Sequence, residues 1–343
     1  MPRAHRTTLP ARTLAAVGAL AATAVLAACS ADTPAAGSAP SGAASGTTYP
    51  LTLDNCGAEV TFESAPQRVV TVKSSTAETL LALGLGDRIV GAAFLDGEVP
   101  GWLTDDAAGT AVAEPFSDEV PGTEATLELE PDLVYAGWES NVSADGIGDR
   151  ETLTSLGVNT YVAPAACKDP AYMPDPLTFD AVFDEITEVG TVFDVPDAAA
   201  DLVADQRALL NDVTADDRGL SALWYSSGSD IPYVGAGIGA PQMILDAVGL
   251  QNVAADVEDT WTSMSWEEVV DADPDVIVLV DAAWNTAGSK IQALQENAAT
   301  AELTAVREGR FLVVPFPATE AGVRNVEAAA DLSRQLGDLD LDE

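Results

Sequence analysis

Residue types that commonly carry catalytic chemistry are scarce in this sequence. The chain holds a single histidine, His5, which lies in a segment that we expect to be removed. The mature protein would then have no histidine for zinc or haem ligation, for acid–base catalysis or for a Ser-His-Asp triad. The sequence also lacks a G-x-S-x-G nucleophile motif, a P-loop and a cluster of metal ligands. An enzyme would have to rely on carboxylates alone, so we predict a binding protein without catalytic residues, cofactor or metal.

The first 28 residues have the layout of a bacterial export signal. Three arginines form a basic region, and an apolar run follows from Leu14 to Leu26. This run is too short to span a bilayer and is typical of a signal-peptide core. The sequence Leu26-Ala27-Ala28-Cys29 resembles the lipobox of bacterial lipoproteins, in which the cysteine is acylated and becomes the new N-terminus. We predict a signal peptide over 1–28 and a lipid anchor at Cys29, on the extracytoplasmic face of the cell membrane. An ordinary secretory signal with a chance cysteine is the alternative.

A segment of low complexity follows the signal. Residues 29–48 are almost all Ala, Gly, Ser, Pro and Thr. This composition cannot form a packed core, so we predict a flexible tether. No later stretch approaches 18 consecutive apolar residues, and we expect the rest of the mature chain to be soluble.

Two cysteines remain after the predicted lipidation site, Cys56 and Cys167. An even pair in an exported and therefore oxidising setting favours a disulfide. Two separate buried thiols are the alternative. A bond between them would close a long loop within one domain.

Charge and length limit the classes of function further. The 343 residues include 15 Lys plus Arg against 55 Asp plus Glu, a net charge of -40. A phosphate backbone would be repelled by this charge, which excludes a nucleic-acid partner. Hydrophobic residues make up 47% of the chain, enough for real cores, and the length suggests two domains.

The chain after the tether contains an internal repeat of strand and helix patterns. In each half a buried strand precedes a helix, and a short helix then leads through Pro-Asp into another apolar strand. The predicted elements of the first half are Arg68–Val72, Ser74–Leu83, Arg88–Phe94 and the stretch from Glu124 to Tyr135. Those of the second half are Ser221–Tyr225, Gly239–Leu250, Glu267–Val270 and Val276–Val280. We predict two similar α/β lobes with mainly parallel sheets, over 49–170 and 218–343.

A helical stretch lies between the two halves. Apolar residues recur at helical spacing from Phe179 to Leu210, with an interruption around Gly190 and Pro196. We predict a connecting segment over 171–217 in which a long, rigid helix starting at Pro196 joins the lobes.

The lipobox, the tether, the two lobes, the connecting helix and the paired Pro-Asp elements together resemble a known family. They look like the substrate-binding lipoproteins of ABC importers for iron-siderophores and cobalamin, over residues 49–337. The resemblance implies a class III periplasmic-binding-protein fold and a small-molecule ligand in the cleft between the lobes. It also implies a monomer that docks, through one glutamate per lobe, on arginines of a membrane permease served by an ATPase.

The repeat offers one candidate docking glutamate in each lobe. Glu124 stands seven residues before Pro131, and Glu267 stands seven residues before Pro274. A receptor that bridges two permease subunits needs such a symmetric placement. The alternative is that both are solvated acids favoured by a helix N-terminus.

A closer similarity points to a ligand. Several stretches resemble an actinobacterial subgroup whose members are described as coenzyme F420-0 ABC transporter substrate-binding proteins. These stretches are Asn55-Cys-Gly57, Val72-Lys-Ser-Ser75, Ala136-Gly-Trp-Glu-Ser140, Tyr161-Val-Ala-Pro-Ala-Ala-Cys167, Trp224-Tyr-Ser-Ser-Gly228, Tyr233-Val-Gly-Ala-Gly-Ile-Gly-Ala-Pro241 and Pro315-Phe-Pro-Ala-Thr-Glu-Ala-Gly-Val-Arg324. The resemblance implies F420-0 or a related deazaflavin as ligand, with a ferric siderophore or a corrinoid as the alternative.

A deazaflavin needs ring faces for its flat system and cations or backbone N–H groups for its anionic end. The candidates for the ring are Trp138, Tyr225, Tyr233, Trp261 and Trp284, near predicted strand ends or in loops, and Ser226 is a further candidate for ligand binding. The candidates for the anionic end are Lys73, Ser74, Ser75 and Arg324. Core packing is the alternative for each aromatic residue, and an ion pair with Glu320 or Glu327 is the alternative for Arg324. The net charge opposes an anionic ligand at long range, so a cationic or zwitterionic ligand stays open.

One motif is set aside. Gly235-Ala-Gly-Ile-Gly-Ala240 fits a variant of the dinucleotide-binding fingerprint, but the predicted strand ends at Tyr225, about nine residues too early. We expect a flexible loop there that lines the cleft.

Overall fold

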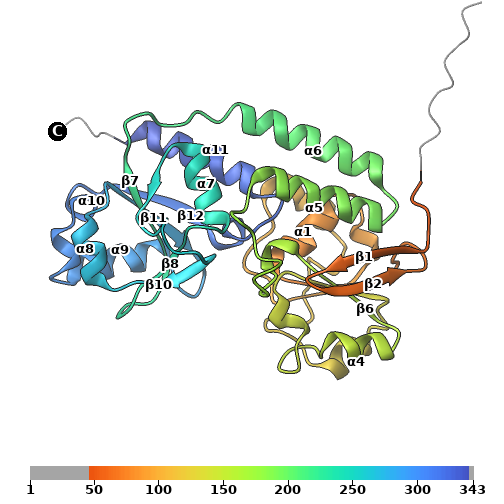
Figure 1. The fold of residues 1–343 in the computed structure, drawn as a ribbon. Coiled ribbons are helices and arrows are strands. Elements are labelled where there is room, and N and C mark those ends of the chain that lie inside the picture. The colour runs from red at the N-terminus through yellow and green to blue at the C-terminus, as the bar shows by residue number, and fades with distance from the viewer. Residues whose placement is uncertain (1–45, 340–343) are drawn as a thin grey trace, which may run out of the picture. The chain divides into compact units, whose positions relative to one another are not determined.

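The computed structural model describes residues 46–339. The predicted signal peptide, the predicted lipidation site Cys29 and all but the last residues of the predicted tether lie outside this range. The described chain forms two α/β lobes with helices along their junction (Figure 1). Within residues 46–339, every helix is too short or too polar to cross a bilayer.

The N-terminal lobe is built on a parallel sheet of four strands in the order β4-β3-β5-β6. Alternate residues of these strands face two apolar layers, one shared with α1 and the other with α3 and α4. Strands buried on both faces explain the continuous apolar runs in the sequence. The bounds are β3 (Val69–Val72), α1 (Ser74–Ala82), β4 (Ile89–Ala93), α2 (Thr104–Ala107), α3 (Thr123–Leu127), β5 (Leu133–Ala136), α4 (Arg150–Ser155) and β6 (Asn159–Val162). An antiparallel hairpin precedes them, β1 (Leu51–Asn55) and β2 (Ala58–Phe62).

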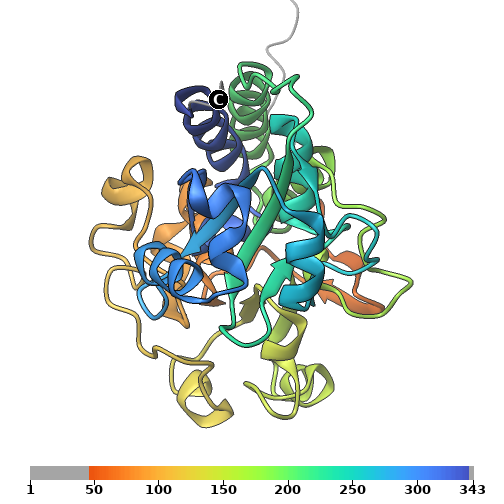
Figure 2. The ribbon, with the colours of Figure 1, turned by 90° about the vertical axis from the view of Figure 1, so that its left-hand side faces the viewer.

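The C-terminal lobe contains a sheet with helices on both faces (Figure 2). Its parallel part has the order β9-β7-β11-β12, and β8 and β10 extend it as antiparallel strands next to β7. One face packs against α7 and α11, and the other against α8, α9 and α10. The bounds are β7 (Ser221–Ser227), β8 (Tyr233–Gly235), α7 (Ala240–Val248), β9 (Gln251–Asn252), β10 (Trp261–Ser263), α8 (Trp266–Ala272), β11 (Val276–Asp281), α9 (Ala287–Glu296), α10 (Thr304–Arg307), β12 (Phe311–Pro315) and α11 (Asn325–Asp338).

The Pro-Asp pair of each repeat anchors one central strand to its neighbour. Asp132 precedes β5, and its carboxylate accepts the backbone N–H groups of Gln67 and Arg68 ahead of β3. Asp275 precedes β11, and its carboxylate accepts the backbone N–H and the hydroxyl of Ser221 at the start of β7. The two lobes therefore repeat a hydrogen-bonding device as well as the strand order, which fixes the register of the paired strands at their amino ends.

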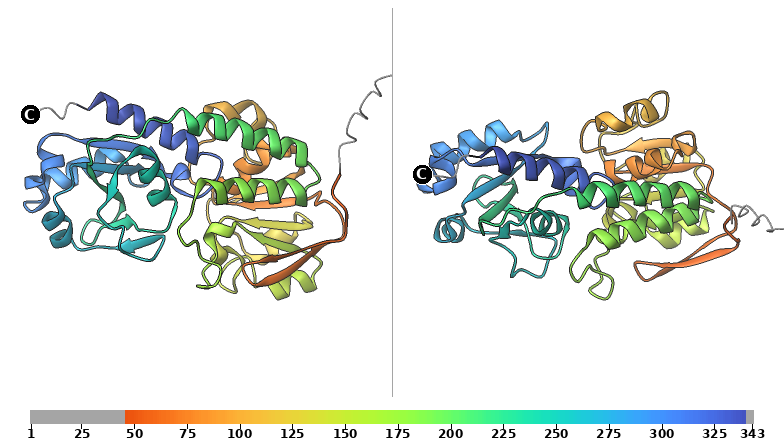
Figure 3. Two further views of the ribbon diagram at one scale, coloured as in Figure 1. Left: turned by 45° about the horizontal axis from the view of Figure 1, so that its top comes forward. Right: turned by 90° about the horizontal axis from the view of Figure 1, so that it is seen from above.

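The connecting segment consists of two helices, α5 (Phe179–Val192) and α6 (Pro196–Asn211). The second begins at Pro196 as predicted, and α6 packs beside both α5 and α11 (Figure 3). Gly190 of α5 allows the close approach of the helices, because a Cβ there would lie 2.3 Å from the Cβ of Ala199. The two lobes are thus linked by a packed helical layer.

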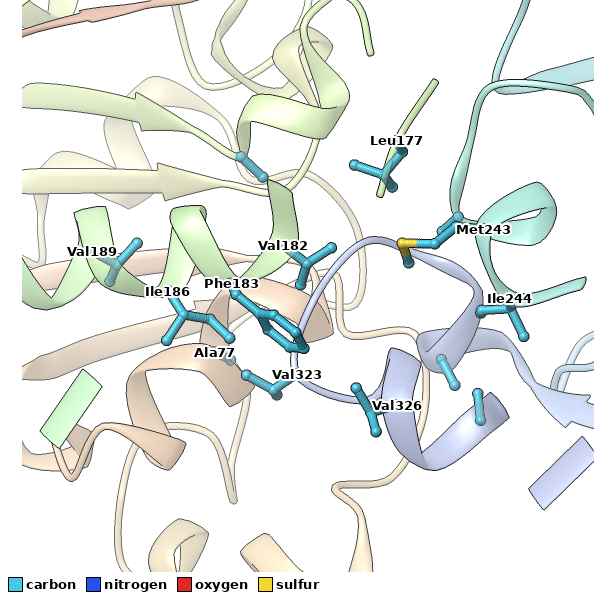
Figure 4. Packing of buried hydrophobic residues seen from close by; sticks show 14 of the residues in the cluster. Ala77, Leu177, Val182, Phe183, Ile186, Val189, Met243, Ile244, Val323 and Val326 are labelled. Carbon is cyan, nitrogen blue, oxygen red and sulfur yellow. The ribbon is translucent and has the colours of Figure 1, made fainter. Parts of the chain in front are cut away.

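A single apolar core crosses the junction of the lobes. Val323, just before α11, and Val326, in its first turn, pack with Ala77 of α1, Phe183 of α5 and Ile244 of α7 (Figure 4). Shared burial of this kind opposes relative movement of the lobes, because opening them would expose apolar surface to water.

Two local expectations were wrong. The strand predicted to end at Tyr225 runs to Ser227, and the loop expected around Gly235 begins with a further strand, β8. This strand has three residues, too few for an alternating pattern to reveal it, and it pairs with β10 and β7. The end of the predicted tether also has contacts, since Thr47 donates its backbone N–H to Asp194.

A carboxyl group on α5, buried against the N-terminal lobe, makes the free energy of unfolding depend on pH. Glu185 of α5 is 8% exposed, and its carboxyl accepts a hydrogen bond from the hydroxyl of Tyr135 (2.8 Å). Burial raises the pKa of Glu185 from 4.5 to about 7, against the opposing effect of the Tyr135 hydrogen bond. The folded protein therefore binds a proton more tightly than the unfolded chain, and stability falls as pH rises from about 4.5 to about 7.

We expect Glu185→Gln to remove this penalty. The variant should unfold like the wild type at pH 4 and gain up to about 3 kcal/mol at pH 8, measured by urea denaturation across this range. The exposed neighbour on the same helix, Asp184→Asn, is the matched control and should give no such pH-dependent gain. A difference between Glu185→Gln and wild type that stays constant with pH would contradict the assignment.

Candidate functional site

A pocket of about 410 Å³ lies between the two lobes. Its walls come from segments that follow the carboxyl ends of parallel strands in both sheets: 137–140 after β5, 163–168 after β6, 226–227 at the end of β7 and 316–321 after β12. Ligands of open α/β sheets bind at this end of the strands, because the loops there converge around a crevice. The volume lies within the usual range for small-molecule sites.

Aromatic side chains form much of the pocket wall. Tyr233 of β8 stacks on Trp261 of β10, with ring centroids 5.9 Å apart and ring planes 14° from parallel. Trp284 is 65% exposed and meets the ring of Phe316 edge-on at 6.0 Å. Trp138 contributes a further ring from the opposite lobe. Large rings left exposed around a cleft are a typical lining for a ligand with flat apolar surface.

A buried lysine fixes the turn that carries Trp284. Ala282 and Asn285 exchange backbone hydrogen bonds around this turn. The amino group of Lys290, from α9, donates to the carbonyl oxygens of Val280 and Asn285 on either side. Burial lowers the pKa of Lys290 to about 8. Hydrogen bonds of the backbone on either side therefore hold the turn that carries Trp284, although the ring itself is exposed.

Lys73 lies behind the pocket wall and does not line it. Its amino group forms an ion pair with Asp96, and it lies 3.7 Å from the ring centre of Trp138 and 5.1 Å from that of Phe316. Its side chain is 1% exposed. Gly137 gives it room, because a Cβ at that position would lie 2.7 Å from the Cβ of Lys73. Lys73, predicted as an anion contact, therefore packs behind two pocket rings, and its charge is neutralised by Asp96.

Arg324 is also paired inside the protein. Its guanidinium donates two hydrogen bonds to the carboxylate of Glu78, at 2.7 and 2.5 Å, and one to the carbonyl of Glu98. Glu78 belongs to α1 of the N-terminal lobe, so the ion pair bridges the lobes. Burial raises the pKa of Glu78 to about 7, although the Arg324 guanidinium opposes this. The alternative partners considered for Arg324 in the sequence, Glu320 and Glu327, do not pair with it.

The pocket brings together six of the ten predicted ligand-binding residues. These are Ser75, Trp138, Ser226, Tyr233, Trp261 and Trp284. The other four, Lys73, Ser74, Tyr225 and Arg324, do not line it. The hydroxyl of Ser74 accepts the backbone N–H of Asp96, and Tyr225 is 3% exposed and packs edge-on against Trp266 in the core of the C-terminal lobe.

Among the lining residues that were not predicted from the sequence, four carry a charge or an aromatic ring: Glu139, Lys168, Phe316 and Glu320. Three of them lie inside stretches that carried the family resemblance, but their types did not match the expected ring and anion contacts. Lys168 directly follows the stretch that ends at Cys167. Among the described residues, Lys168 is the lysine whose amino group makes no ion pair or hydrogen bond. The amino group of Lys73 pairs with Asp96, and that of Lys290 donates to backbone carbonyl groups.

A disulfide between Cys56 and Cys167 holds the segment that carries Lys168. Cys56 lies at the turn of the β1–β2 hairpin. Beside it the amide of Asn55 pairs with both backbone groups of Val162, at the end of β6, with two hydrogen bonds of 2.8 Å. The disulfide and these hydrogen bonds therefore attach the hairpin to the end of β6 and to the loop after it, which forms part of the pocket wall.

Two acidic residues line the pocket, Glu139 and Glu320. The carboxylate of Glu139 accepts the backbone N–H of Lys168 (2.6 Å), while Glu320 lies at the lobe junction. It comes from the loop after β12, and one of its carboxylate oxygens, Oε2, accepts the indole N–H of Trp138 across the junction (3.1 Å). Burial raises the pKa of Glu320 above its usual value, and the charge of Asp96 adds to this, while Lys73, the indole N–H of Trp138 and Lys168 act in the opposite direction. Among the described residues, no three His, Cys, Asp or Glu side chains gather as metal ligands.

A model of the periplasmic binding protein family matches residues 69–318, well over half of the chain. The chain belongs to the periplasmic binding protein family. Among its relatives is the "uncharacterized ABC transporter substrate-binding lipoprotein YvrC" of Bacillus subtilis, 27% identical over 300 residues that cover 84% of this chain and 86% of that protein. A "cobalamin-binding protein" of Halobacterium salinarum is 28% identical over 242 residues, 67% of this chain and 58% of that protein.

Solved structures of periplasmic binding proteins match the fold. A structure described as an ABC-type Fe3+-hydroxamate transport system, from Saccharomonospora viridis, is 29% identical with a TM-score of 0.72, covering 84% of this chain and all of that one. A periplasmic binding protein from Veillonella parvula is 26% identical with a TM-score of 0.73, covering 85% and 98%. The predicted class III α/β fold is confirmed.

The two candidate docking glutamates occupy the same place in each lobe of this periplasmic binding protein. Glu124 lies in the first turn of α3 before β5, and Glu267 lies in the first turn of α8 before β11. Both side chains are exposed. The central strands β5 and β11 hold equivalent positions in the two sheets, so the repeat gives each lobe one acidic group on a matching short helix.

We expect Arg324→Ala to destabilise the protein because it would leave Glu78 buried and unpaired. Loss of one partner of a buried pair costs about 3–5 kcal/mol, and Glu78→Met combined with Arg324→Met should recover most of this. Urea denaturation measures both. The exposed pair Arg334–Asp331 provides the control, since Arg334→Ala should cost at most about 1 kcal/mol. Weakened ligand binding at unchanged stability in Arg324→Ala would instead support Arg324 as an anion contact.

Proposed function

We propose that this protein is the extracytoplasmic substrate-binding lipoprotein of an ABC importer. It captures a small molecule in the pocket between its lobes and delivers it to a membrane permease and its ATPase. The observation that carries the proposal is the pocket itself, at the carboxyl ends of the strands of both sheets and lined by exposed rings. The family match over residues 69–318 and the lipoprotein relative support it.

The proposed ligand is coenzyme F420-0 or a related deazaflavin. The stacked pair Tyr233–Trp261 and the exposed Trp284 suit a flat ring system. The anionic end requires a different contact from those expected, because Lys73 and Arg324 are engaged in ion pairs. We assign that contact to Lys168, a lining residue whose amino group makes no ion pair or hydrogen bond among the described residues.

A ferric siderophore or a corrinoid is the second candidate ligand. It is favoured by the relatives, one described as a cobalamin-binding protein and one as an Fe3+-hydroxamate transport system. The importer role, the docking and the lobe arrangement are common to both candidates. An enzyme that acts through carboxylates is a different class of function, and it would turn its ligand over where a receptor releases it unchanged.

The proposed mode of action places a monomer on the outer face of the cell membrane, held through acyl chains on Cys29. Two exposed glutamates, Glu124 and Glu267, contact basic residues of the permease, one from each lobe. The apolar core shared by the lobes keeps these two groups at a fixed separation. Docking then requires no large rearrangement of the receptor.

Titration of the soluble protein that begins after Cys29 tests the ligand. Tryptophan fluorescence, with calorimetry as confirmation, is followed on addition of F420-0, its phosphate-free precursor, cobalamin and ferric siderophores. We expect tight binding of F420-0 and at least ten-fold weaker binding of the precursor, which lacks the anionic group for Lys168. Binding of a corrinoid or siderophore alone would discard the deazaflavin and keep the importer role.

Substitution of both docking glutamates tests delivery. Glu124→Ala combined with Glu267→Ala should abolish uptake of the bound ligand into cells that carry the importer, while the dissociation constant measured in solution stays unchanged. Glu128→Ala combined with Asp271→Ala is the matched control, because these acids are exposed on or directly beside the same two helices. Loss of affinity in the first double variant, or equal loss of uptake in the second, would contradict the docking role.

A further inference from the structure

Glu320 has an unused hydrogen-bonding capacity inside the pocket. One oxygen, Oε2, accepts the indole N–H of Trp138, and the other, Oε1, accepts no hydrogen bond from the described residues. Its carboxyl group makes no ion pair among residues 46–339, because the nearby Lys73 is paired with Asp96. A partly buried carboxylate without a cation is costly unless a further donor reaches it.

The position of this carboxylate is fixed from both lobes. The side chain of Asn325, fully buried, donates to the backbone carbonyl of Glu320 (2.7 Å) and accepts the N–H of Gly322 (2.8 Å). Gly322 in turn lies against Ser75 of the opposite lobe, where a Cβ would be 3.3 Å from the Cβ of Ser75. Together with the Trp138 hydrogen bond, these contacts preorganise Oε1 as an acceptor before any ligand arrives.

The surroundings of Glu320 restrict what can reach it. Trp138 and Phe316 line the same part of the pocket, so the group that approaches Oε1 is carried on a flat ring. An anionic group would be repelled, since the charge of Lys73 is compensated by Asp96. Lys168, on the segment after β6, makes no ion pair through its amino group among the described residues, although its charge lowers the pKa of Glu320, and it is the lining cation that an anionic group of the same ligand could contact.

We propose that Glu320 is a specificity residue that accepts a hydrogen bond from a ring N–H of the ligand, which makes the ligand class a planar heteroaromatic ring with an amide or imide N–H at its edge. The inference rests on the proposed function, because it names the ligand chemistry of that pocket. A hydrogen bond to a charged acceptor contributes about 1.5–3 kcal/mol, so its loss corresponds to roughly 10- to 100-fold in affinity.

A double-mutant cycle between protein and ligand tests this assignment. The probes are the phosphate-free deazaflavin precursor, whose pyrimidinedione ring carries an imide N–H, and the same compound methylated at that nitrogen. Wild type should bind the N–H compound at least ten-fold more tightly than the methylated one. In Glu320→Ala both should bind about equally, at the weaker level. Glu320→Gln, which keeps shape and a neutral acceptor, should fall between the two.

The control is Glu98→Gln, an exposed glutamate outside the pocket, which should behave as wild type. Melting temperatures of all variants separate loss of the contact from loss of the fold. If the methylated compound still binds more weakly than the N–H compound in Glu320→Ala, the assignment of Glu320 is wrong, and the deazaflavin ligand is unaffected. Binding of cobalamin or a ferric siderophore, with none of either ring compound, would overturn the ligand class and leave the importer role, which the docking variants test separately. Failure of every probe would overturn the ligand class as well.

Discussion

The loop between β12 and α11 inserts into the junction of the lobes, and the pocket depends on this insertion. Val323 of this loop and Val326 in the first turn of α11 complete a core shared by both lobes, and Arg324 of the loop pairs with Glu78 of the N-terminal lobe. The same loop delivers Phe316 and Glu320 to the pocket. The packing that joins the lobes therefore also sets the distance between the two pocket walls.

The few cations of this acidic chain are used mainly as internal supports. Lys73 and Arg324 neutralise buried carboxylates, and Lys290 satisfies carbonyl groups behind the turn of Trp284. Pairing them internally leaves the pocket with one available cation, Lys168, and with the acceptor Glu320. In the proposed binding mode, selectivity rests on these two groups and on the exposed rings, which supply contact area without charge.

Much of the fold was predictable because its strands are buried on both faces. Continuous apolar runs marked β3, β5, β7 and β11, and the Pro-Asp pairs marked the repeat, since Asp132 and Asp275 make equivalent hydrogen bonds. The β8–β10 pair was not predictable, because each strand has three residues, too few for an alternating pattern to show. The aromatic members of the site were found for a related reason: rings near strand ends in α/β proteins lie beside the ligand crevice.

The sequence by itself determined which classes of function the composition excludes, the repeat, the helix that starts at Pro196 and six of the residues that line the pocket. Only the tertiary structure decided which charged groups face the pocket and which form ion pairs with one another inside the protein. Lys73 and Arg324 are separated from Asp96 and Glu78 by 23 and 246 residues, respectively. A charge is neutralised by whichever opposite charge the fold brings within a few ångströms, and residue spacing along the chain carries no information on such long-range pairs.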